Sequence, residues 1–295
     1  MDLVQVTDNV YFLPGRVNIG VVRDGAEAIV IDSGLNDDSA RRIVKAIEGV
    51  GWHITVLINT HSHADHCGGN KYIQEKTKAQ IYAPAIEAQM IEVPYLEPWY
   101  LSSGAMPIDE LQNQFLMARP SHVDKVMDNK GELDIGSTKM TIVSLPGHSP
   151  NQIGIEVEET FFCADSVFSE EVLDRHKIPF FIDIGKEKQT LAFLQGSSSR
   201  YYVPSHATPG TLIRDLVAAN SKAILDVEKY ITEETGDGTK DQILKRVCDK
   251  FGVKLNEFPQ YYLTSTAVMA YLSYLQKQGR LKPTLAENEL TWRKV

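Results

Sequence analysis

Short runs of apolar residues, separated by turn-forming residues, mark the first part of the chain. Residues 10–13, 18–22 and 28–31 form three such runs, with Pro-Gly and Asp-Gly pairs in the gaps between them. This pattern predicts β-strands joined by tight turns. The run 54–58 is apolar and rich in β-branched side chains, which is typical of a buried strand.

Helical spacing alternates with these strands. The apolar residues between Ile43 and Val50 fall on one face of a helix that ends at Gly51. Strand and helix patterns then continue to about residue 206. They predict a helix–strand unit over 70–82, strands over 133–135, 140–145, 152–157, 161–164 and 200–203, and a helix over 186–194.

The pattern changes after Pro209-Gly210, where helices replace strands. Thr239 and Gln242 have the spacing of a capping box, which marks the start of a helix. The predicted elements are, in order, helices over 213–234, 239–250 and 261–277 and a hairpin over 281–293. We therefore predict two domains, residues 1–210 and residues 211–295.

Length and composition indicate the size of the molecule and restrict its partners. The 295 residues, 43% of them hydrophobic, suffice for one large domain or two with buried cores. A net charge of −9 and a pI near 5.4 argue against a general nucleic-acid-binding surface. We expect no membrane span and no secretory signal, because no long apolar stretch and no basic leader are present. Three cysteines, odd in number and far apart, fit reduced thiols in a cytoplasmic protein.

Residues 60–69, Thr-His-Ser-His-Ala-Asp-His-Cys-Gly-Gly, directly follow the buried strand described above. Three histidines and one aspartate fall within six residues, at the end of a strand, where α/β proteins commonly bind ligands. Imidazole and carboxylate ligands suit zinc and iron. His61 and His63 can bind one metal while Asp65 and His66 bind a second. A polar loop that is merely rich in histidine is the competing interpretation, and four metal-binding side chains among six residues argue against it.

The segment 61–66 resembles the H-x-H-x-D-H signature of the metallo-β-lactamase superfamily. That family also requires a histidine after a strand, an aspartate at the end of the next strand and a histidine near the end of the domain. His148, Asp165 and His206 occupy these places, so all seven positions are filled. The resemblance covers roughly the first 210 residues. It implies an α/β fold, a four-layer αββα sandwich with the metals at one edge of the two sheets.

The resemblance also gives each ligand a place in a two-metal site. It implies that metal one binds His61, His63 and His148, that metal two binds Asp65, His66 and His206, and that Asp165 bridges them. Asp32 is expected to support the site by accepting an N–H from a ligand histidine, with an aspartate in a simple turn as the alternative. We expect two divalent cations, with zinc as the first choice and iron or manganese also suited to these ligands.

A carboxylate between two cations about 3.5–4 Å apart is an established arrangement for generating hydroxide near neutral pH. The predicted function is therefore hydrolysis of a small ester-type substrate, a thioester, a lactone or similar, by a metal-bridging hydroxide, with Asp65 among the catalytic residues. Phosphodiesterases or endoribonucleases of the same fold, and persulfide dioxygenases with a single iron, are the alternatives. A metal-free scaffold is disfavoured by the seven intact ligands.

Two positions help to place the chain within the superfamily. His63 argues against the flavodiiron branch, where a glutamate is expected, and Asp165 argues against true β-lactamases, which lack that bridging aspartate. The complete set looks most like glyoxalase II-type thioesterases, lactonases and phosphodiesterases. No confident match is found in the tail for the basic residues with which glyoxalase II binds glutathione.

Residues 85–129 form an insertion in which the periodic pattern loosens, over a length unusual for a plain loop. One interpretation is a lid over the metals, in which Tyr95, Trp99 and Tyr100 form an apolar substrate pocket. The other is a helical pair packed on the surface or against another subunit. The lid interpretation is favoured.

Several other residues near these motifs are not counted as ligands. His53 precedes a strand, His122 lies in the insertion and His176 lies in a segment predicted as an irregular loop. Cys67 is expected to pack rather than to bind metal. Gly68-Gly69 is expected to let the backbone pass close to the metals.

The predicted C-terminal helices and hairpin look like the winged-helix tail of some superfamily members. A winged helix suggests nucleic acid only by analogy, and no strongly basic helix is present here. We therefore expect the tail to serve in packing or in a possible homodimer. The expected partner is a small-molecule substrate, without nucleic acid and without a membrane.

Overall fold

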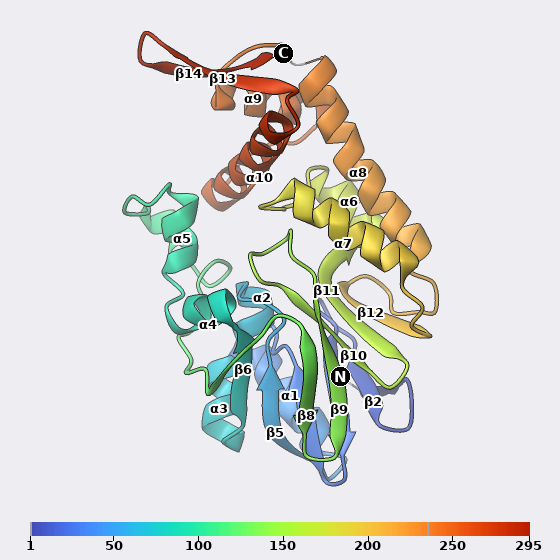
Figure 1. Ribbon diagram of the computed structural model, residues 1–295. Helices are drawn as coiled ribbons and strands as arrows, with labels where there is room; N and C mark the ends of the chain where they lie inside the picture. Colours follow the sequence, from blue (N-terminus) through green and yellow to red (C-terminus); the bar gives the residue numbers. More distant parts are fainter. Residues whose placement is uncertain (1, 235) are drawn as a thin grey trace.

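Two β-sheets lie face to face in the protein, whose computed structural model describes residues 2–234 and 236–295 (Figure 1). The first sheet has seven strands in chain order, β1 (Val4–Gln5), β2 (Val10–Leu13), β3 (Ile19–Asp24), β4 (Glu27–Ile31), β5 (His53–Ile58), β6 (Gln80–Pro84) and β7 (Lys125–Met127). The second has five, in the order β12 (Tyr201–His206), β11 (Thr160–Phe168), β10 (Ile153–Val157), β9 (Thr138–Ser144) and β8 (Gly131–Ile135). Strands β4 to β7 are parallel, as are β11 and β12.

Alternate residues of the central strands enter two different cores, because successive side chains of a strand point to opposite faces. In β4, Ile29 and Ile31 pack between the two sheets, whereas Val30 packs under the helices of the outer layer. Ile155 and Phe162 of the second sheet complete the inner core. Burial on both faces explains why β4 is a continuous apolar run.

Helices cover the outer face of each sheet. The first sheet carries α1 (Asp37–Glu48) and α3 (Asn70–Thr77), and the second carries α7 (Ile184–Gly196) and α8 (Arg214–Glu233). Asn36 caps α1 by accepting a hydrogen bond from the Ser39 N–H, and the buried face of α1 includes Ile43 and Ile47, as the periodicity predicts. The predicted four-layer αββα sandwich is confirmed.

Short segments are where the structure differs from the predicted elements. The segment of His176 forms a helix, α6 (Glu170–His176), and the metal segment contains a single helical turn, α2 (Ala64–Cys67). The insertion holds α4 (Ala85–Glu92), α5 (Leu96–Leu101) and a 3-10 turn (Asp109–Leu111), and its end forms β7 at the edge of the first sheet. Because α6 buries none of its residues, no apolar periodicity reveals it, and β7 is too short to show alternation.

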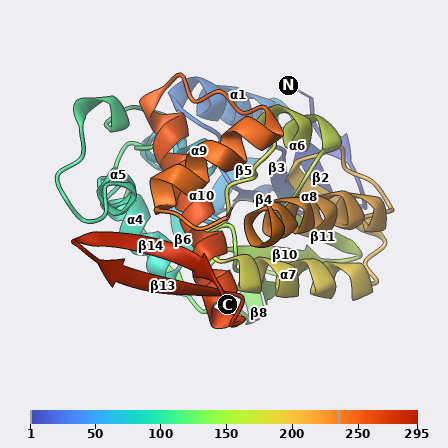
Figure 2. The same ribbon diagram turned by 90° about the horizontal axis from the view of Figure 1, so that it is seen from above.

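The C-terminal helices stand above the sandwich, at the end that holds α5 and α6 (Figures 1 and 2). They are α8, α9 (Lys240–Phe251) and α10 (Phe258–Lys277), followed by the hairpin of β13 (Leu281–Ala286) and β14 (Glu289–Lys294). Thr239 and Gln242 form the predicted capping box, and Gly238 pairs with Trp292 of the hairpin. This order of elements matches the winged-helix-like tail that the sequence predicts. One apolar core runs from Leu194 of α7 to Tyr271 of α10, so the division at residue 210 stays a prediction.

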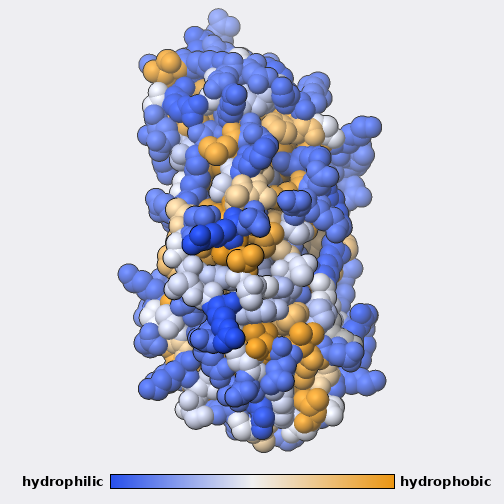
Figure 3. Space-filling view, turned by 90° about the vertical axis from the view of Figure 1, so that its right-hand side faces the viewer, coloured by the Kyte–Doolittle hydropathy of each residue, from blue (hydrophilic) through white to orange (hydrophobic). Residues whose placement is uncertain are grey.

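Within the described part of the chain, no helix combines the length and the apolarity needed to cross a bilayer. The face on the right of Figure 1, which includes α6 and α8, is mainly hydrophilic, with apolar residues in separate patches near its mid-height and lower down (Figure 3).

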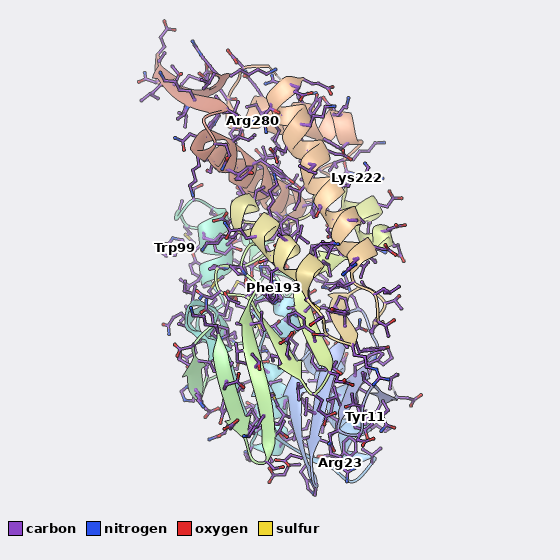
Figure 4. The ribbon with its side chains drawn as sticks, turned by 45° about the vertical axis from the view of Figure 1, so that its right-hand side comes forward. Tyr11, Arg23, Trp99, Phe193, Lys222 and Arg280 are labelled. Atoms are coloured by element: carbon purple, nitrogen blue, oxygen red, sulfur yellow. The ribbon has the colours of Figure 1, made fainter. Side chains whose placement is uncertain are left out.

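A buried carboxylate joins the C-terminal helices to α7. Glu228 of α8 accepts hydrogen bonds from Lys188 Nζ and from Arg280 Nη1, each at 2.5 Å. Arg280 also donates to Thr232 Oγ1 at 2.8 Å, and Lys188 donates to the Tyr274 hydroxyl at 3.2 Å. Arg280 lies where α10 meets the hairpin (Figure 4). The Glu228 carboxylate thus connects α8 and the junction of α10 with the hairpin to α7 of the sandwich.

We expect Glu228→Gln to lower the free energy of unfolding by about 2 kcal/mol, because it leaves two cations without their shared carboxylate. Urea unfolding followed by circular dichroism measures this change. Glu233→Gln on the same helix is the matched control, since Glu233 is exposed, and should change stability by less than about 0.5 kcal/mol. Equal effects of the two substitutions would contradict the proposed role of Glu228.

Candidate metal centre

The two glycines between α2 and α3 pack closely against the chain that follows β4. A Cβ atom on Gly68 would lie 1.9 Å from the Leu35 carbonyl oxygen, and one on Gly69 would lie 2.4 Å from that of Ser33. Only glycine fits there. The close approach is therefore to the 33–35 backbone, whereas the sequence pattern suggested an approach to the metals. Cys67 is buried and donates its S–H to the Ser62 carbonyl at 3.1 Å, as expected of a packing residue.

All seven predicted ligands gather at one edge of the two sheets. Potential ligand atoms lie within 4.8 Å of one another in each of three groups: His61, His63 and His148; His61, His66 and Asp165; and Asp65, His66 and His206. The first and third groups are the predicted triads of metal one and metal two. Among the described residues, His53, His122 and His176 belong to no such group.

Asp165 lies between the two triads. Its Oδ1 is 3.2 Å from His66 Nε2, and its Oδ2 is 3.2 Å from His206 Nε2 and 3.5 Å from His148 Nε2. Asp65 approaches the same area from α2, with its Oδ2 3.3 Å from His206 Nε2. The Asp165 carboxylate therefore contacts histidines of both predicted triads.

Several buried atoms of this cluster have no hydrogen-bond partner among the described residues. Nε2 of His61 has none, and Nε2 of His66 and Oδ1 of Asp165 have only their 3.2 Å contact with each other. Unpaired buried polar atoms are costly in a folded protein unless another group satisfies them. Imidazole nitrogens and carboxylate oxygens that converge in this way are suitable ligands for divalent cations.

Neighbouring oxygen atoms orient the histidine rings. Asp32 Oδ2 lies 2.8 Å from His66 Nδ1, the Phe180 carbonyl 2.9 Å from His148 Nδ1, and the Arg16 carbonyl 3.0 Å from His206 Nδ1. With Nδ1–H donated to each oxygen, the neutral form of each ring directs its Nε2 lone pair into the cluster.

Asp32 occupies a strained position that matches its expected supporting role. Its φ is +66°, in the left-handed region that aspartate tolerates better than most residues. Its carboxylate also accepts hydrogen bonds from the Thr60 N–H and hydroxyl, both at 2.8 Å. Thr60 Oγ1 in turn lies 3.0 Å from His61 Nδ1. Asp32 is thus connected to ligands of both triads, which an aspartate in a simple turn would not be.

The first triad is electrically neutral at pH 7. Burial and the nearby His66 lower the pKa of His61 well below its ordinary value. Burial lowers the pKa of both His63 and His148 to about 4. Neutral imidazole is the form that binds metal.

The second triad is charged when no cation is present. Burial opposes the charge on His206, but Asp165 and Asp65 outweigh it and raise the pKa of His206 to about 10. The same balance with Asp165 and Asp32 raises the pKa of His66 well above its ordinary value. Burial would raise the pKa of Asp165, but His206 and His66 hold it well below the ordinary value. In the absence of metal, one proton on His66 and one on His206 thus occupy the nitrogen atoms that a cation would need as ligands.

A cavity of about 1330 Å³ opens onto the second triad. Asp65, His148 and His206 form its floor, and Arg16, Phe168 and Phe180 are among the residues of its wall. The first turns of α10 contribute as well, with Glu257, Gln260, Leu263 and Thr264. The sequence pattern missed these wall residues, because they come from segments that only the fold brings together.

The aromatic residues of the insertion do not form this pocket. Tyr95, Trp99 and Tyr100 are not among its lining residues, and their role in a substrate pocket stays a prediction. Trp99 is 44% exposed at the outer edge of the molecule on α5 (Figure 4), because its indole N–H bonds locally to the Gly104 carbonyl. The insertion reaches the cavity indirectly, since its Leu111 belongs to a small apolar cluster with Phe180.

Comparisons with known proteins place these features in a family. The sequence model described as Metallo-beta-lactamase superfamily matches residues 13–206. A hydroxyacylglutathione hydrolase from Erythrobacter litoralis is 28% identical over 148 residues, covering 50% of this chain and 45% of that protein. An acyl-coenzyme A thioesterase from Gallus gallus is 23% identical over 180 residues, covering 57% of this chain and 64% of that protein. The chain thus spans about half the length of the curated relatives it matches.

Solved structures extend the likeness in fold to the C-terminal helices. A metallo-beta-lactamase family protein from Thermus thermophilus has a TM-score of 0.75 at 14% identity, covering 98% of this chain and 99% of that chain. A beta-lactamase domain protein from Burkholderia ambifaria has a TM-score of 0.76 at 15% identity, covering 100% of this chain and 94% of that chain. Because the family match also spans every predicted ligand from His61 to His206, the chain belongs to the metallo-β-lactamase superfamily, with glyoxalase II-like relatives.

Proposed function

We propose that this protein is a two-metal hydrolase that cleaves a small ester-type substrate. The observation that carries the proposal is the place of Asp165, whose carboxylate lies within 3.5 Å of histidines from both triads. A carboxylate in that position can bridge two cations. Two complete triads favour two cations over a single iron.

The proposed ligands are those predicted from the sequence, with His61, His63 and His148 on one cation and Asp65, His66 and His206 on the other. Zinc is the proposed metal, since imidazole and carboxylate are its common ligands. When bound, such cations supply hydroxide near neutral pH and polarise an acyl oxygen.

Asp65 is the proposed catalytic carboxylate. Its side chain is about one-third exposed, whereas that of Asp165 is 5% exposed, so Asp65 is the ligand carboxylate that faces the cavity. Burial would raise the pKa of Asp65, but His66 and His206 outweigh this effect and lower it, so the carboxylate is ionised at neutral pH. An ionised carboxylate at the cavity floor can accept a proton from the attacking oxygen and return it to the leaving group.

The wall of the cavity supports an acyl substrate that carries an anionic group. Phe168, Phe180 and Leu263 offer an apolar surface beside the metal ligands. Arg16 provides a cation at the same wall and has no carboxylate within ion-pair distance among the described residues, whereas Arg175 is paired with Glu171 at 2.7 Å. The names of the relatives, hydroxyacylglutathione hydrolase and acyl-coenzyme A thioesterase, favour a thioester over a lactone.

Acidic residues on the same wall count against RNA as the substrate. Glu170 and Glu257 line the cavity and have no basic side chain within ion-pair distance among the described residues, whereas Glu171 is paired with Arg175. They would repel a polyanion along its length, whereas one anionic group can be met by Arg16 alone. We therefore rank a phosphodiesterase or endoribonuclease activity second.

Asp165→Asn should remove the charge that two cations share while keeping the shape of the side chain. We expect bound zinc to fall from about two to about one per chain, and kcat for thioester hydrolysis to fall on the order of 10²-fold. Zinc is measured by plasma mass spectrometry, and circular dichroism checks the fold. Asp174→Asn, at an exposed position on α6, is the matched control. A folded variant with both zinc ions and normal turnover would disprove the bridging role.

Protons should compete with metal at the second triad only. His206, with a pKa of about 10, must lose its proton to bind metal, whereas His63 and His148, with pKa values of about 4, are already neutral at pH 5.5. After dialysis against a fixed low concentration of free zinc, we expect about two ions per chain at pH 8 and about one at pH 5.5. Loss of both ions together as the pH falls is the contrary outcome.

Arg16→Gln tests the anion contact without disturbing the metal ligands, because Arg16 orients His206 through its backbone carbonyl. We expect KM for a thioester with an anionic thiol group to rise about tenfold, with kcat and zinc content unchanged. KM for an uncharged thioester should not change. Arg41→Gln on α1 is the control at an exposed arginine. Equal increases in KM for the two thioesters would show that Arg16 does not recognise the anionic group.

A further inference from the structure

Glu87, in the first turn of α4, is a fully buried carboxylate close to the ligand segments. Its Oε2 accepts hydrogen bonds from the Ser62 N–H at 3.0 Å and from the Ser62 hydroxyl at 2.6 Å. Its Oε1 accepts hydrogen bonds from the Ser149 hydroxyl at 2.8 Å and from the Asn151 N–H at 2.8 Å. Four donors thus converge on one side chain.

These donors belong to two segments that carry metal ligands. Ser62 stands between His61 and His63, and Ser149 directly follows His148. The two segments are far apart in the chain, and the three histidines they carry are the complete first triad. One carboxylate therefore connects both sources of that triad.

The four bonds also account for the burial of the charge. Within the described residues, no lysine, arginine or histidine lies within ion-pair distance of Glu87. A buried carboxylate without such a partner depends on hydrogen bonds, and charge-assisted bonds of this kind are short and strong. Movement of either segment would therefore break hydrogen bonds to Glu87. Glu87 thus restrains the two segments relative to each other.

The position of Glu87 follows from the fold. β6 ends at Pro84, α4 begins at Ala85, and this puts the first turn of α4 at the sheet edge where the ligands gather. Glu87 lies within the segment that the sequence pattern marks as a lid. The first helix of that segment, α4, is hydrogen-bonded through Glu87 to both segments that carry the first triad.

We propose that Glu87 is a positioning residue, which holds the His61–His63 segment and the His148 segment at the separation that one cation requires. The proposal rests on the proposed two-metal function. It assigns to Glu87 an effect on metal one and little effect on metal two, whose ligands lie on α2, β11 and β12 or at their ends.

Glu87→Gln is the most direct variant. Glutamine keeps the shape but offers one acceptor oxygen and one amide donor, so one of the two donor pairs faces another donor. We expect the variant to bind the first-triad cation at least tenfold more weakly, with the second site within about twofold of wild type. The kcat for thioester hydrolysis should fall more than KM rises, because the cation is displaced in the reacting geometry.

Titration with Co²⁺ provides a readout that a general loss of packing would not move. The visible absorption of Co²⁺ responds to the arrangement of its ligands, so the band of the first triad should shift in Glu87→Gln while the other band stays. Ser149→Ala, which removes one donor of the four and keeps the carboxylate, should weaken the same site by a smaller factor, about two- to fivefold. Glu92→Gln is the matched control on the same helix, because Glu92 bonds to His122 and Val123, away from the ligands.

The possible failures can be told apart. Wild-type protein that binds fewer than two Co²⁺ ions contradicts the two-metal function itself. Wild type with two ions, together with unchanged affinities and spectra in Glu87→Gln, contradicts the role of Glu87, as does an equal loss at both sites. If Glu87→Gln does not fold, Ser149→Ala decides the question, and an unchanged first-triad affinity in that variant overturns the proposal.

Discussion

The Asp165 carboxylate, buried among histidines of both triads, is the interaction on which the rest of the site depends. A carboxylate placed within β11, where every residue of the strand is buried, is unfavourable unless positive charge compensates it. Without metal, protonated His66 and His206 supply that charge. Two cations would supply more of it. The folded protein can thus keep these side chains together without metal, and a cation that binds there must displace the two protons.

The fold meets this demand by bringing strand ends to one edge. The proposed ligands follow β5, lie in the last half of β11, end β12, or lie in the segment between β9 and β10. Backbone carbonyls of Phe180 and Arg16, and the carboxylate of Asp32, fix the rings of three histidines. The loops that carry Phe180 and Arg16 also line the cavity, so the parts that orient the ligands are continuous with the parts that meet substrate. The C-terminal helices contribute Leu263 to the same wall, which gives the tail a place in the site besides packing.

Short motifs in the sequence were enough to predict which residues gather at the sheet edge, whereas contacts between distant segments could not be predicted. Each ligand lies in a short motif at the end of an apolar strand, and Thr239 with Gln242 marks a helix start within four residues, so both could be predicted from the sequence. The lining of the cavity joins residues as distant as Arg16 and Leu263, and no periodicity relates them. Glu87 looks like any acidic residue in a helix turn, and only the folded chain shows its four donors. Tyr95, Trp99 and Tyr100 were assigned to the pocket because they are aromatic, but side-chain type does not tell which way a short helix turns.

The central claim is that two cations lie on either side of Asp165. Anomalous X-ray diffraction at the zinc edge, from crystals of zinc-loaded protein, tests it most directly. The account predicts two anomalous peaks, one among His61, His63 and His148 and the other among Asp65, His66 and His206, with Asp165 between them and within bonding distance of both. A single peak at full occupancy, or two peaks with Asp165 turned away from either, would contradict it.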